Sequence, residues 1–241
     1  MKDAMFVFDA SGSMGTTDLT AKKPHIARVI DALRIVVPEI PADRKMGLIV
    51  YGEGEYNKCD SIELRLAPQP NAGPLILSEV EKVRPAGRTP LADSVEQAAD
   101  VLNYRNNPSV VILLTDGEET CGGKPCDLAK HLRSTAQDLT VHVIGYRNVA
   151  AGGLTATSGA RCLAEDNGGL YLSVESTDQL IEALRKTLTC PMITQLPPAH
   201  PDAPDKEGTQ ISQASRRIGP SRSLERGAAG VLGRKFQDCP R

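Results

Sequence analysis

The sequence predicts an α/β fold: a doubly wound, mostly parallel sheet of six strands with one antiparallel edge strand and helices on both faces. Two observations predict it. Short apolar runs of strand length alternate with longer amphipathic runs of helical period along residues 1–190. The second and third strand-like runs are joined by a short polar loop, as in a hairpin, and this places one strand antiparallel to its neighbour.

The first half of this region holds three strands and three helices. The run at 4–8 is wholly apolar and predicts a buried strand. Segment 24–37 has apolar residues at helical spacing, with Pro24 near its start and Pro38 just past its end. Strands follow at 46–51 and, with alternating apolar residues, at 61–66, and helices follow at 75–83 and 91–102.

The second half continues the alternation. The run at 110–114 is the most hydrophobic of the chain and indicates a central strand covered on both faces. A helix at 126–136, a strand at 141–146, a helix within 155–166, a strand at 170–174 and a helix at 177–188 follow. Segment 148–159 is rich in Gly and Ala, so the sequence leaves open where the helix within 155–166 begins.

The composition bounds the domain organisation. Residues 1–190 suffice for one domain with a single core, and the Pro-, Ser- and Arg-rich segment 191–241 is expected to be a disordered tail, with a solvated linker favoured over a partner-binding segment. The net charge of −2 predicts no basic field for nucleic acid, and no run approaches the roughly 20 apolar residues of a membrane span. No secretory signal precedes the first strand, which favours a cytoplasmic chain or the mature part of an exported one.

Three segments carry hard oxygen donors. Asp9, Ser11 and Ser13 follow the first strand, Thr89 lies in a loop before a helix, and Asp116 follows the central strand. Ligands bind at the carboxyl ends of strands in such sheets, and we expect both aspartates on neighbouring strands with the threonine reaching the same rim. Two carboxylates and three hydroxyls, completed by water, suit Mg²⁺ rather than zinc. Taken alone, segment 9–13 fits a helix-capping loop equally well.

The local sequences Phe-Asp-Ala-Ser-Gly-Ser-Met, Gly-Arg-Thr-Pro-Leu and Leu-Thr-Asp-Gly-Glu-Glu-Thr-Cys-Gly-Gly carry a family resemblance. They resemble bacterial members of the von Willebrand factor type A family, which has the integrin I-domain fold, and the likeness covers residues 2 to about 190. The metal-ion-dependent adhesion site (MIDAS) of that family has the pattern Asp-x-Ser-x-Ser, a distant Thr and a distant Asp. Here these are Asp9, Ser11, Ser13, Thr89 and Asp116.

The resemblance implies roles for these residues. The three hydroxyls coordinate Mg²⁺ (or Mn²⁺ or Ca²⁺), both aspartates act directly or through water, and Asp9 also orients its loop. An open position on the cation accepts an Asp or Glu carboxylate from a protein partner. Neutral hydroxyl ligands leave the cation electrophilic, which favours that carboxylate. Glu118 and Glu119 lie close to Asp116, and solvated surface charges are favoured over auxiliary acceptors.

The leading hypothesis is a metal-dependent protein-binding module for adhesion or scaffolding, not an enzyme. Gly-x-Ser-x-Gly is absent from the Ser13 region, which disfavours a nucleophile elbow. No histidine is expected at the rim beside a nucleophile, and His142 is expected to be a core or edge residue rather than a ligand; the histidines are His25, His131, His142 and His200. Two alternatives stay open: a Mg²⁺-dependent phosphoesterase or phosphotransfer enzyme, although Ser11 stands where a second acid is expected, and a metal-independent structural subunit of an assembly. The oligomeric state is not predicted.

The favoured interpretation of the cysteines is that they form disulfides that fix the loops around the metal. The six cysteines are Cys59, Cys121, Cys126, Cys162, Cys190 and Cys239. The first four allow three pairings, and the last two flank the tail and pair with each other or with nothing. Unpaired buried thiols and a Cys₄ zinc site are alternatives, the zinc site weakened by the lack of a second matched pair. Disulfides imply a periplasmic or extracellular location; free thiols imply a cytoplasmic one.

Overall fold

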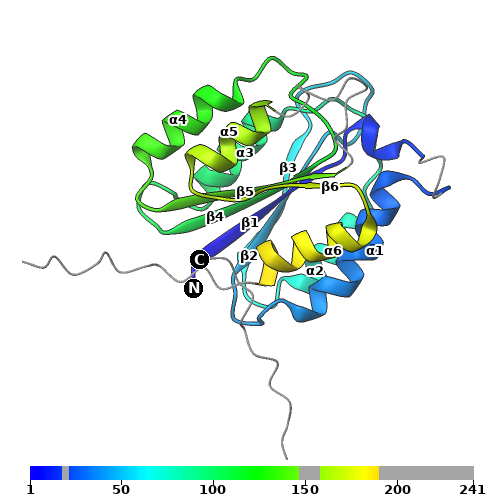
Figure 1. The fold of residues 1–241 in the computed structure, drawn as a ribbon, viewed down its shortest axis with the longest axis horizontal. Coiled ribbons are helices and arrows are strands. Elements are labelled where there is room, and N and C mark those ends of the chain that lie inside the picture. Colours follow the sequence, from blue (N-terminus) through cyan, green and yellow to red (C-terminus); the bar gives the residue numbers. More distant parts are fainter. Residues whose placement is uncertain (18–21, 147–157, 190–241) are drawn as a thin grey trace, which may run out of the picture. The chain divides into compact units, whose positions relative to one another are not determined.

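The computed structural model describes residues 1–17, 22–146 and 158–189. They form a six-stranded sheet in the order β3-β2-β1-β4-β5-β6 with helices on both faces (Figure 1). The strands are β1 Asp3–Asp9, β2 Met46–Tyr51, β3 Ile62–Gln69, β4 Ser109–Thr115, β5 Leu139–Tyr146 and β6 Tyr171–Val174. The helices are α1 His25–Val36, α2 Gly73–Val80, α3 Leu91–Val101, α4 Pro125–Thr135, α5 Ser158–Asp166 and α6 Thr177–Leu184.

The sheet topology confirms the predicted fold class. Strand β1 lies at the centre and pairs in parallel with both β2 and β4, so that Phe6 is opposite Leu48 on one side and Ile112 on the other. Strands β5 and β6 continue the parallel ladder. Only β3 runs antiparallel, as the edge partner of β2, which is the arrangement that the hairpin-like spacing predicts.

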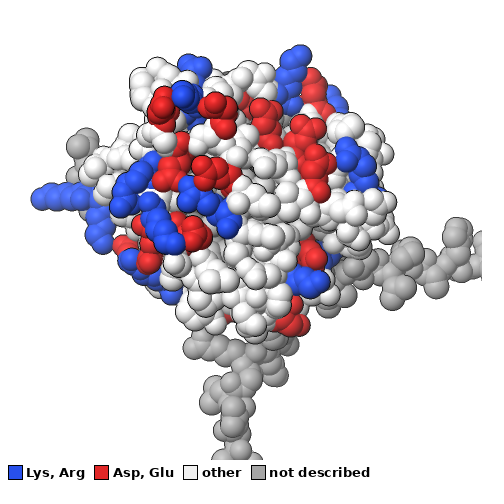
Figure 2. Space-filling model, turned by 180° about the vertical axis from the view of Figure 1, so that it is seen from behind, with Lys and Arg blue, Asp and Glu red and all other residues white. Residues whose placement is uncertain are grey.

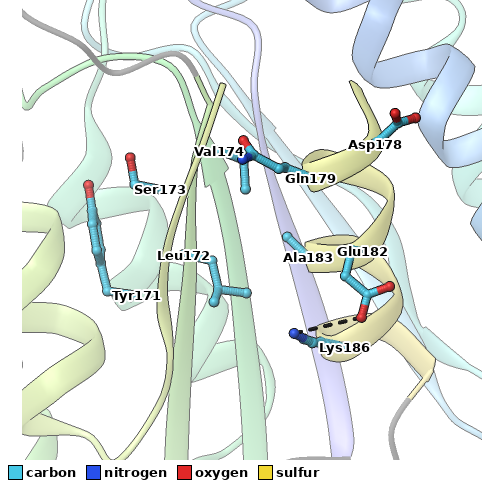
Figure 3. A pocket seen from close by; sticks show the side chains of 9 residues that line it. All are labelled: Tyr171, Leu172, Ser173, Val174, Asp178, Gln179, Glu182, Ala183 and Lys186. Atoms are coloured by element: carbon cyan, nitrogen blue, oxygen red, sulfur yellow. Dashed lines mark ion pairs between the residues drawn. The ribbon is translucent and has the colours of Figure 1, made fainter. Parts of the chain in front are cut away.

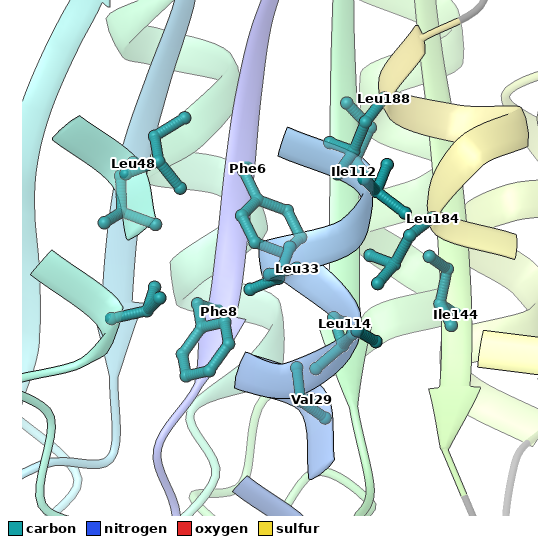
Figure 4. Packing of buried hydrophobic residues seen from close by; sticks show 14 of the residues in the cluster. Phe6, Phe8, Val29, Leu33, Leu48, Ile112, Leu114, Ile144, Leu184 and Leu188 are labelled. Atoms are coloured by element: carbon teal, nitrogen blue, oxygen red, sulfur yellow. The ribbon is translucent and has the colours of Figure 1, made fainter. Parts of the chain in front are cut away.

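The side chains of the buried strands alternate between the two faces of the sheet and so form two hydrophobic cores, one on each face. Successive side chains of a strand point to opposite faces. Phe6 and Phe8 pack with Leu33 and Val29 of α1 in the layer that also contains α2 and α6 (Figure 4). Val7, on the other face, packs in the layer formed by α3, α4 and α5 (Figure 1). The sheet is therefore covered on both sides, as predicted.

The element boundaries differ from the sequence prediction by three or more residues in three places. Helix α2 begins at Gly73 and ends at Val80, earlier than the predicted 75–83. Strand β3 runs on to Gln69 through Pro68, which an edge strand tolerates because its outer side needs no backbone donor. Helix α6 ends at Leu184 and continues as a π-helical turn, Arg185–Thr189. Within the described residues, no helix is long and apolar enough to cross a membrane.

Two predictions concern residues that lie outside the described part of the chain. Helix α5 begins at Ser158, and the preceding Gly- and Ala-rich segment up to residue 157 lies outside the described residues. The predicted tail, 191–241, also lies outside them, so the proposed boundary at residue 190 stays a prediction.

Candidate functional site

The carboxyl ends of β1 and β4 place Asp9 and Asp116 at one rim of the sheet. Asp9 is the last residue of β1, and Asp116 directly follows Thr115, the last residue of the neighbouring β4. Asp9 Oδ1 accepts a hydrogen bond from the Ser11 backbone N–H at 2.7 Å, and its Oδ2 accepts one from Thr115 Oγ1 at 2.6 Å. Asp9 therefore shapes the loop that follows it and links this loop to β4.

The three predicted hydroxyls lie at the same rim. Ser11 Oγ and Ser13 Oγ are 2.9 Å apart, and Ser13 Oγ donates to Asp116 Oδ1 at 2.5 Å. A Cβ atom placed on Gly117 would lie 3.6 Å from Ser13 Oγ and 3.7 Å from Thr89 Oγ1, so these hydroxyls approach Gly117 together. The structure thus brings the five predicted residues together, and their role as metal ligands stays a prediction.

Backbone hydrogen bonds between the rim loops position Thr89. Gly12 N–H donates to Gly87 O at 2.9 Å, and Gly87 N–H donates to Gly52 O at 2.7 Å. Gly52 has φ +77°, and a Cβ there would stand 2.7 Å from the backbone of both Ser11 and Arg88, so only glycine fits. Three loops that are distant in sequence are therefore packed backbone to backbone beside the site.

A fourth loop holds Thr89 from the other side. Thr120 Oγ1 accepts a hydrogen bond from the Thr89 N–H at 2.8 Å, and the Thr120 N–H donates to Thr89 O at 3.1 Å. Both backbone groups of Thr89 are thereby fixed, and the residue as a whole is 4 % exposed. The threonine hydroxyl is preorganised at the rim.

The electrostatics of the site favour a cation. Asp9 is fully buried, and burial together with the nearby charge of Asp116 raises its pKa from 3.8 to about 6, against the opposing hydrogen bonds from Ser11 and Thr115. The pKa of the buried Tyr51 phenol is also raised, first by burial and then by the charge of Asp9. Two carboxylates that repel each other are stabilised by a cation between them.

The donor chemistry fits a hard cation rather than zinc. The described residues contain no group of three or more His, Cys, Asp and Glu side chains arranged to hold a metal. A cation at this rim would therefore depend on the hydroxyls of Ser11, Ser13 and Thr89 beside the carboxylates, the oxygen ligands that Mg²⁺, Mn²⁺ and Ca²⁺ prefer.

His25 is a residue of the site that sequence reasoning missed. The expectation was that no histidine lies at the rim beside a nucleophile, yet His25 Nδ1 is 2.9 Å from Asp116 Oδ2. Its ring packs edge-on against Tyr146, with ring centroids 5.5 Å apart. Because 91 positions separate His25 from Asp116, no local motif carries this contact.

The two glutamates after Asp116 have different roles. Glu118 is exposed, as expected. The expectation of a merely solvated charge is wrong for Glu119, which is half-buried: its Oε2 accepts from the Ala92 N–H at 2.9 Å and its Oε1 from the Cys121 N–H at 2.7 Å. Ala92 lies in the first turn of α3, where backbone N–H groups have no helical partner, so Glu119 caps that helix.

The four cysteines of the described residues form two disulfides, one of which lies at the site. Cys59 pairs with Cys121, and Cys126 pairs with Cys162. The first links the β2–β3 loop to the loop after β4, and the second links α4 to α5. This pairing replaces the alternatives of unpaired thiols and a Cys₄ zinc site. Cys190 and Cys239 lie outside the described residues.

His142 has a structural role, as predicted. It is 3 % exposed within β5, and its Nδ1 accepts a hydrogen bond from the Leu170 N–H at 3.0 Å. Burial, and then the positive charges of Arg44 and Lys2, lower its pKa to about 4, so it stays neutral at physiological pH.

A separate groove of about 610 Å³ lies between β6 and α6 (Figure 3). Leu172 and Val174 of the strand and Ala183 of the helix give it an apolar floor, and Glu182 and Lys186 form an ion pair at 3.6 Å. The five predicted site residues do not line it. Basic and acidic side chains are intermixed on the molecular face that Figure 2 shows.

Comparison with known proteins identifies the family. The family model for the von Willebrand factor type A domain matches residues 3–186. "Uncharacterized protein YwmD" of Bacillus subtilis is 29% identical over 189 residues, which cover 75% of this chain and 82% of that protein. Solved structures also share the fold, and two of them illustrate the likeness.

The first is proximal thread matrix protein 1 from the mussel byssus with a zinc-occupied MIDAS motif (22% identity, TM-score 0.55), where the match covers 78% of this chain and 44% of that chain. The second is the vWF domain of the type V pili tip protein Mfa5 from Porphyromonas gingivalis (11% identity, TM-score 0.54), where it covers 80% and 98%. At these identities the likeness concerns the fold alone. From the family match, the chain belongs to the von Willebrand factor type A domain family.

Proposed function

We propose that this chain is a metal-dependent protein-binding module. Its Asp9, Ser11, Ser13, Thr89 and Asp116 hold Mg²⁺, and a partner protein binds through an Asp or Glu carboxylate. The observation that carries the proposal is the convergence of two buried, mutually repelling carboxylates and three hydroxyls on one rim of the sheet. Membership of a family of protein-interaction domains supports it.

The protein's own contacts suggest a division of roles. Both oxygens of Asp9 accept hydrogen bonds, from the Ser11 backbone and from Thr115, so Asp9 organises the loop, and it would act on the cation directly or through water. Ser11, Ser13 and Thr89 offer neutral hydroxyls, which leave most of the cation's charge uncompensated. The bound cation would supply the electrophilic centre for the partner's carboxylate.

Mg²⁺ is the cation we propose, with Mn²⁺ and Ca²⁺ as the other candidates for the same oxygen donors. The zinc in the MIDAS motif of the byssus protein supports the view that a site of this kind takes a divalent cation. The present donors, hydroxyls and carboxylates, favour the harder ions.

Binding rather than catalysis is the role we infer. In the described part of the chain, the Ser11 hydroxyl contacts the Ser13 hydroxyl, and the Ser13 hydroxyl donates to Asp116. The nearby imidazole of His25 contacts the aspartate rather than a serine. A serine nucleophile requires an adjacent base.

We place this function in an oxidising compartment, the periplasm or the cell exterior. Two disulfides within the described residues support that location, because such bonds persist where thiols are not kept reduced. The fold likeness to the domain of a pilus tip protein agrees with it.

Selection of displayed peptides on the immobilised protein, in Mg²⁺ and then in EDTA, tests the proposal. We expect Mg²⁺-dependent peptides that each contain an Asp or Glu whose change to Asn or Gln abolishes binding. Titration calorimetry should give Mg²⁺ binding that Thr89→Ala or Asp116→Ala weakens at least about 10-fold without unfolding the domain.

Asp100→Ala is the matched control, because Asp100 is an exposed α3 residue whose carboxylate pairs with the exposed Arg105. It should leave Mg²⁺ and peptide binding unchanged. Peptides that bind equally well in EDTA would contradict a metal-bridged interface and favour a metal-independent structural subunit.

A further inference from the structure

We infer that His25 is a positioning residue for Asp116: it holds one oxygen of the carboxylate so that the other is presented to the cation site. This inference rests on the proposed function and adds a residue to it. It is carried by the arrangement of His25, Asp116, Ser13 and Tyr146, which come from four separate segments of the chain.

The two oxygens of Asp116 have different partners. Oδ2 is 2.9 Å from His25 Nδ1, and Oδ1 accepts from Ser13 Oγ at 2.5 Å. An ionised carboxylate only accepts hydrogen bonds, so Nδ1 carries the proton and donates. The Asp116 side chain is 1 % exposed and that of His25 is 16 % exposed, so little water competes for this contact. Oδ2 is therefore engaged by His25, while Oδ1 contacts the Ser13 hydroxyl of the site.

The imidazole is itself held in place. His25 is the first residue of α1, and its N–H donates to Thr16 O at 3.0 Å, which ties the helix start to the loop that carries Ser13. The ring meets the Tyr146 ring edge-on at an interplanar angle of 80°. Tyr146 is the fully buried last residue of β5, so it offers a fixed surface. Such packing restricts the orientation from which Nδ1 donates.

We assign His25 a positioning role and not that of a metal ligand, because its Nδ1 contacts Asp116. His25 Nδ1 is engaged with Asp116 and has no lone pair free when it donates. Hydrogen-bond partners behind a ligand fix its orientation, and their removal typically weakens metal binding about 10- to 100-fold. A site that relies on three neutral hydroxyls depends strongly on the orientation of its carboxylates.

Calorimetric titration with Mg²⁺ of the wild type, His25→Ala, His25→Asn and His25→Gln tests this role. The Asn amide nitrogen superposes on Nδ1, whereas the Gln amide extends toward the other ring nitrogen. We expect His25→Ala and His25→Gln to bind Mg²⁺ about 10-fold more weakly and His25→Asn to recover most of the affinity. His131→Ala, at an exposed histidine of α4, is the matched control and should bind as the wild type.

Electron paramagnetic resonance of bound Mn²⁺ separates positioning from ligation. We expect no nitrogen hyperfine coupling to Mn²⁺; such a coupling would make His25 a ligand and overturn the inference. Equal Mg²⁺ affinity of the wild type, His25→Ala and His25→Gln would overturn it as well. If His25→Ala does not fold, the comparison of the Asn and Gln variants decides in the same way. A wild type that binds no cation would instead defeat the proposed function.

Discussion

At the scale of single residues, Asp9 decides the chemistry of the rim. Its carboxylate is fully buried at the end of a central strand and faces a second carboxylate, Asp116. Hydrogen bonds from Ser11 and Thr115 favour the charged form of Asp9, but they offset only part of the cost of burying it. The pKa of Asp9 therefore stays raised, at about 6. Protons and divalent cations therefore compete for the same buried group.

Cation binding should weaken as the pH falls through 6. Binding of Mg²⁺ requires ionised Asp9, and at pH 5 a group of pKa about 6 is mostly protonated. We expect about 10-fold weaker Mg²⁺ binding at pH 5 than at pH 7.5, measured by titration calorimetry. Thr89→Ala, which leaves Asp9 in place, should bind more weakly at both pH values with the same ratio between them. An affinity that is constant from pH 5 to 7.5 would rule out this competition.

The same shift makes stability depend on pH when no cation is present. The pKa of Asp9 is about 6 in the folded protein and has the ordinary value of 3.8 in the unfolded chain, so the folded state binds the proton more tightly. The free energy of unfolding in EDTA therefore falls as the pH rises from about 4 to 6, by up to about 3 kcal/mol from this group.

Denaturant titrations of the wild type and Asp9→Asn, across this pH range in EDTA, measure that contribution. The variant cannot ionise at position 9, so its free energy of unfolding should decrease less steeply with pH. Parallel pH profiles for the two proteins would contradict the raised pKa.

At the scale of elements, strands and loops differ in how far the sequence predicts them. Apolar runs predict the buried strands because sheet burial on both faces leaves a direct mark on composition. The ends of β1 and β4 predict the positions of Asp9 and Asp116, because the carboxyl ends of the strands form the rim of the sheet. Helix α2 was misplaced because its boundaries depend on turn and capping geometry, which single residues encode weakly.

Contacts between distant loops are the part that the sequence does not predict. Glu119 caps a helix that precedes it by 27 positions, and His25 meets Asp116 from the start of α1. Neither contact leaves a local pattern, since each depends on how three-dimensional packing brings separate loops together. The predicted solvation of Glu119 was wrong for this reason, while the aspartates and hydroxyls, which follow motifs, were brought together as expected.

Loss of the Glu119 cap should destabilise the domain. Glu119→Ala removes the acceptor of the Ala92 and Cys121 N–H groups, and removal of a helix N-terminal cap typically costs about 1 kcal/mol. Denaturant titration should detect this decrease in the free energy of unfolding. Glu118→Ala is the matched control: Glu118 is exposed, and we expect a change within about 0.5 kcal/mol. Equal effects of both changes would refute the capping role.

At the scale of the whole domain, the sheet supplies rigidity and the loops supply the site, so the connections between loops matter. The Cys59–Cys121 disulfide joins two of the four rim loops, and both of its ends adjoin residues that hold the threonine segment. Lys58 O accepts from the Arg88 N–H at 3.2 Å, and Thr120 pairs with Thr89. The Cys126–Cys162 disulfide instead joins two helices on one face of the sheet.

Removal of either disulfide should therefore lower the stability of the domain, whereas only removal of Cys59–Cys121 should weaken cation binding. Their loops span 62 and 36 residues, and chain entropy alone makes each worth up to about 4 kcal/mol of unfolding free energy. We expect the double variants Cys59→Ser/Cys121→Ser and Cys126→Ser/Cys162→Ser to lose comparable stability in denaturant titrations. Only the first should also bind Mg²⁺ more weakly, under conditions where both are folded, because only it frees the segment that carries Thr89. Equal Mg²⁺ affinities in the two variants would mean that the backbone hydrogen bonds between the rim loops hold the threonine without the disulfide.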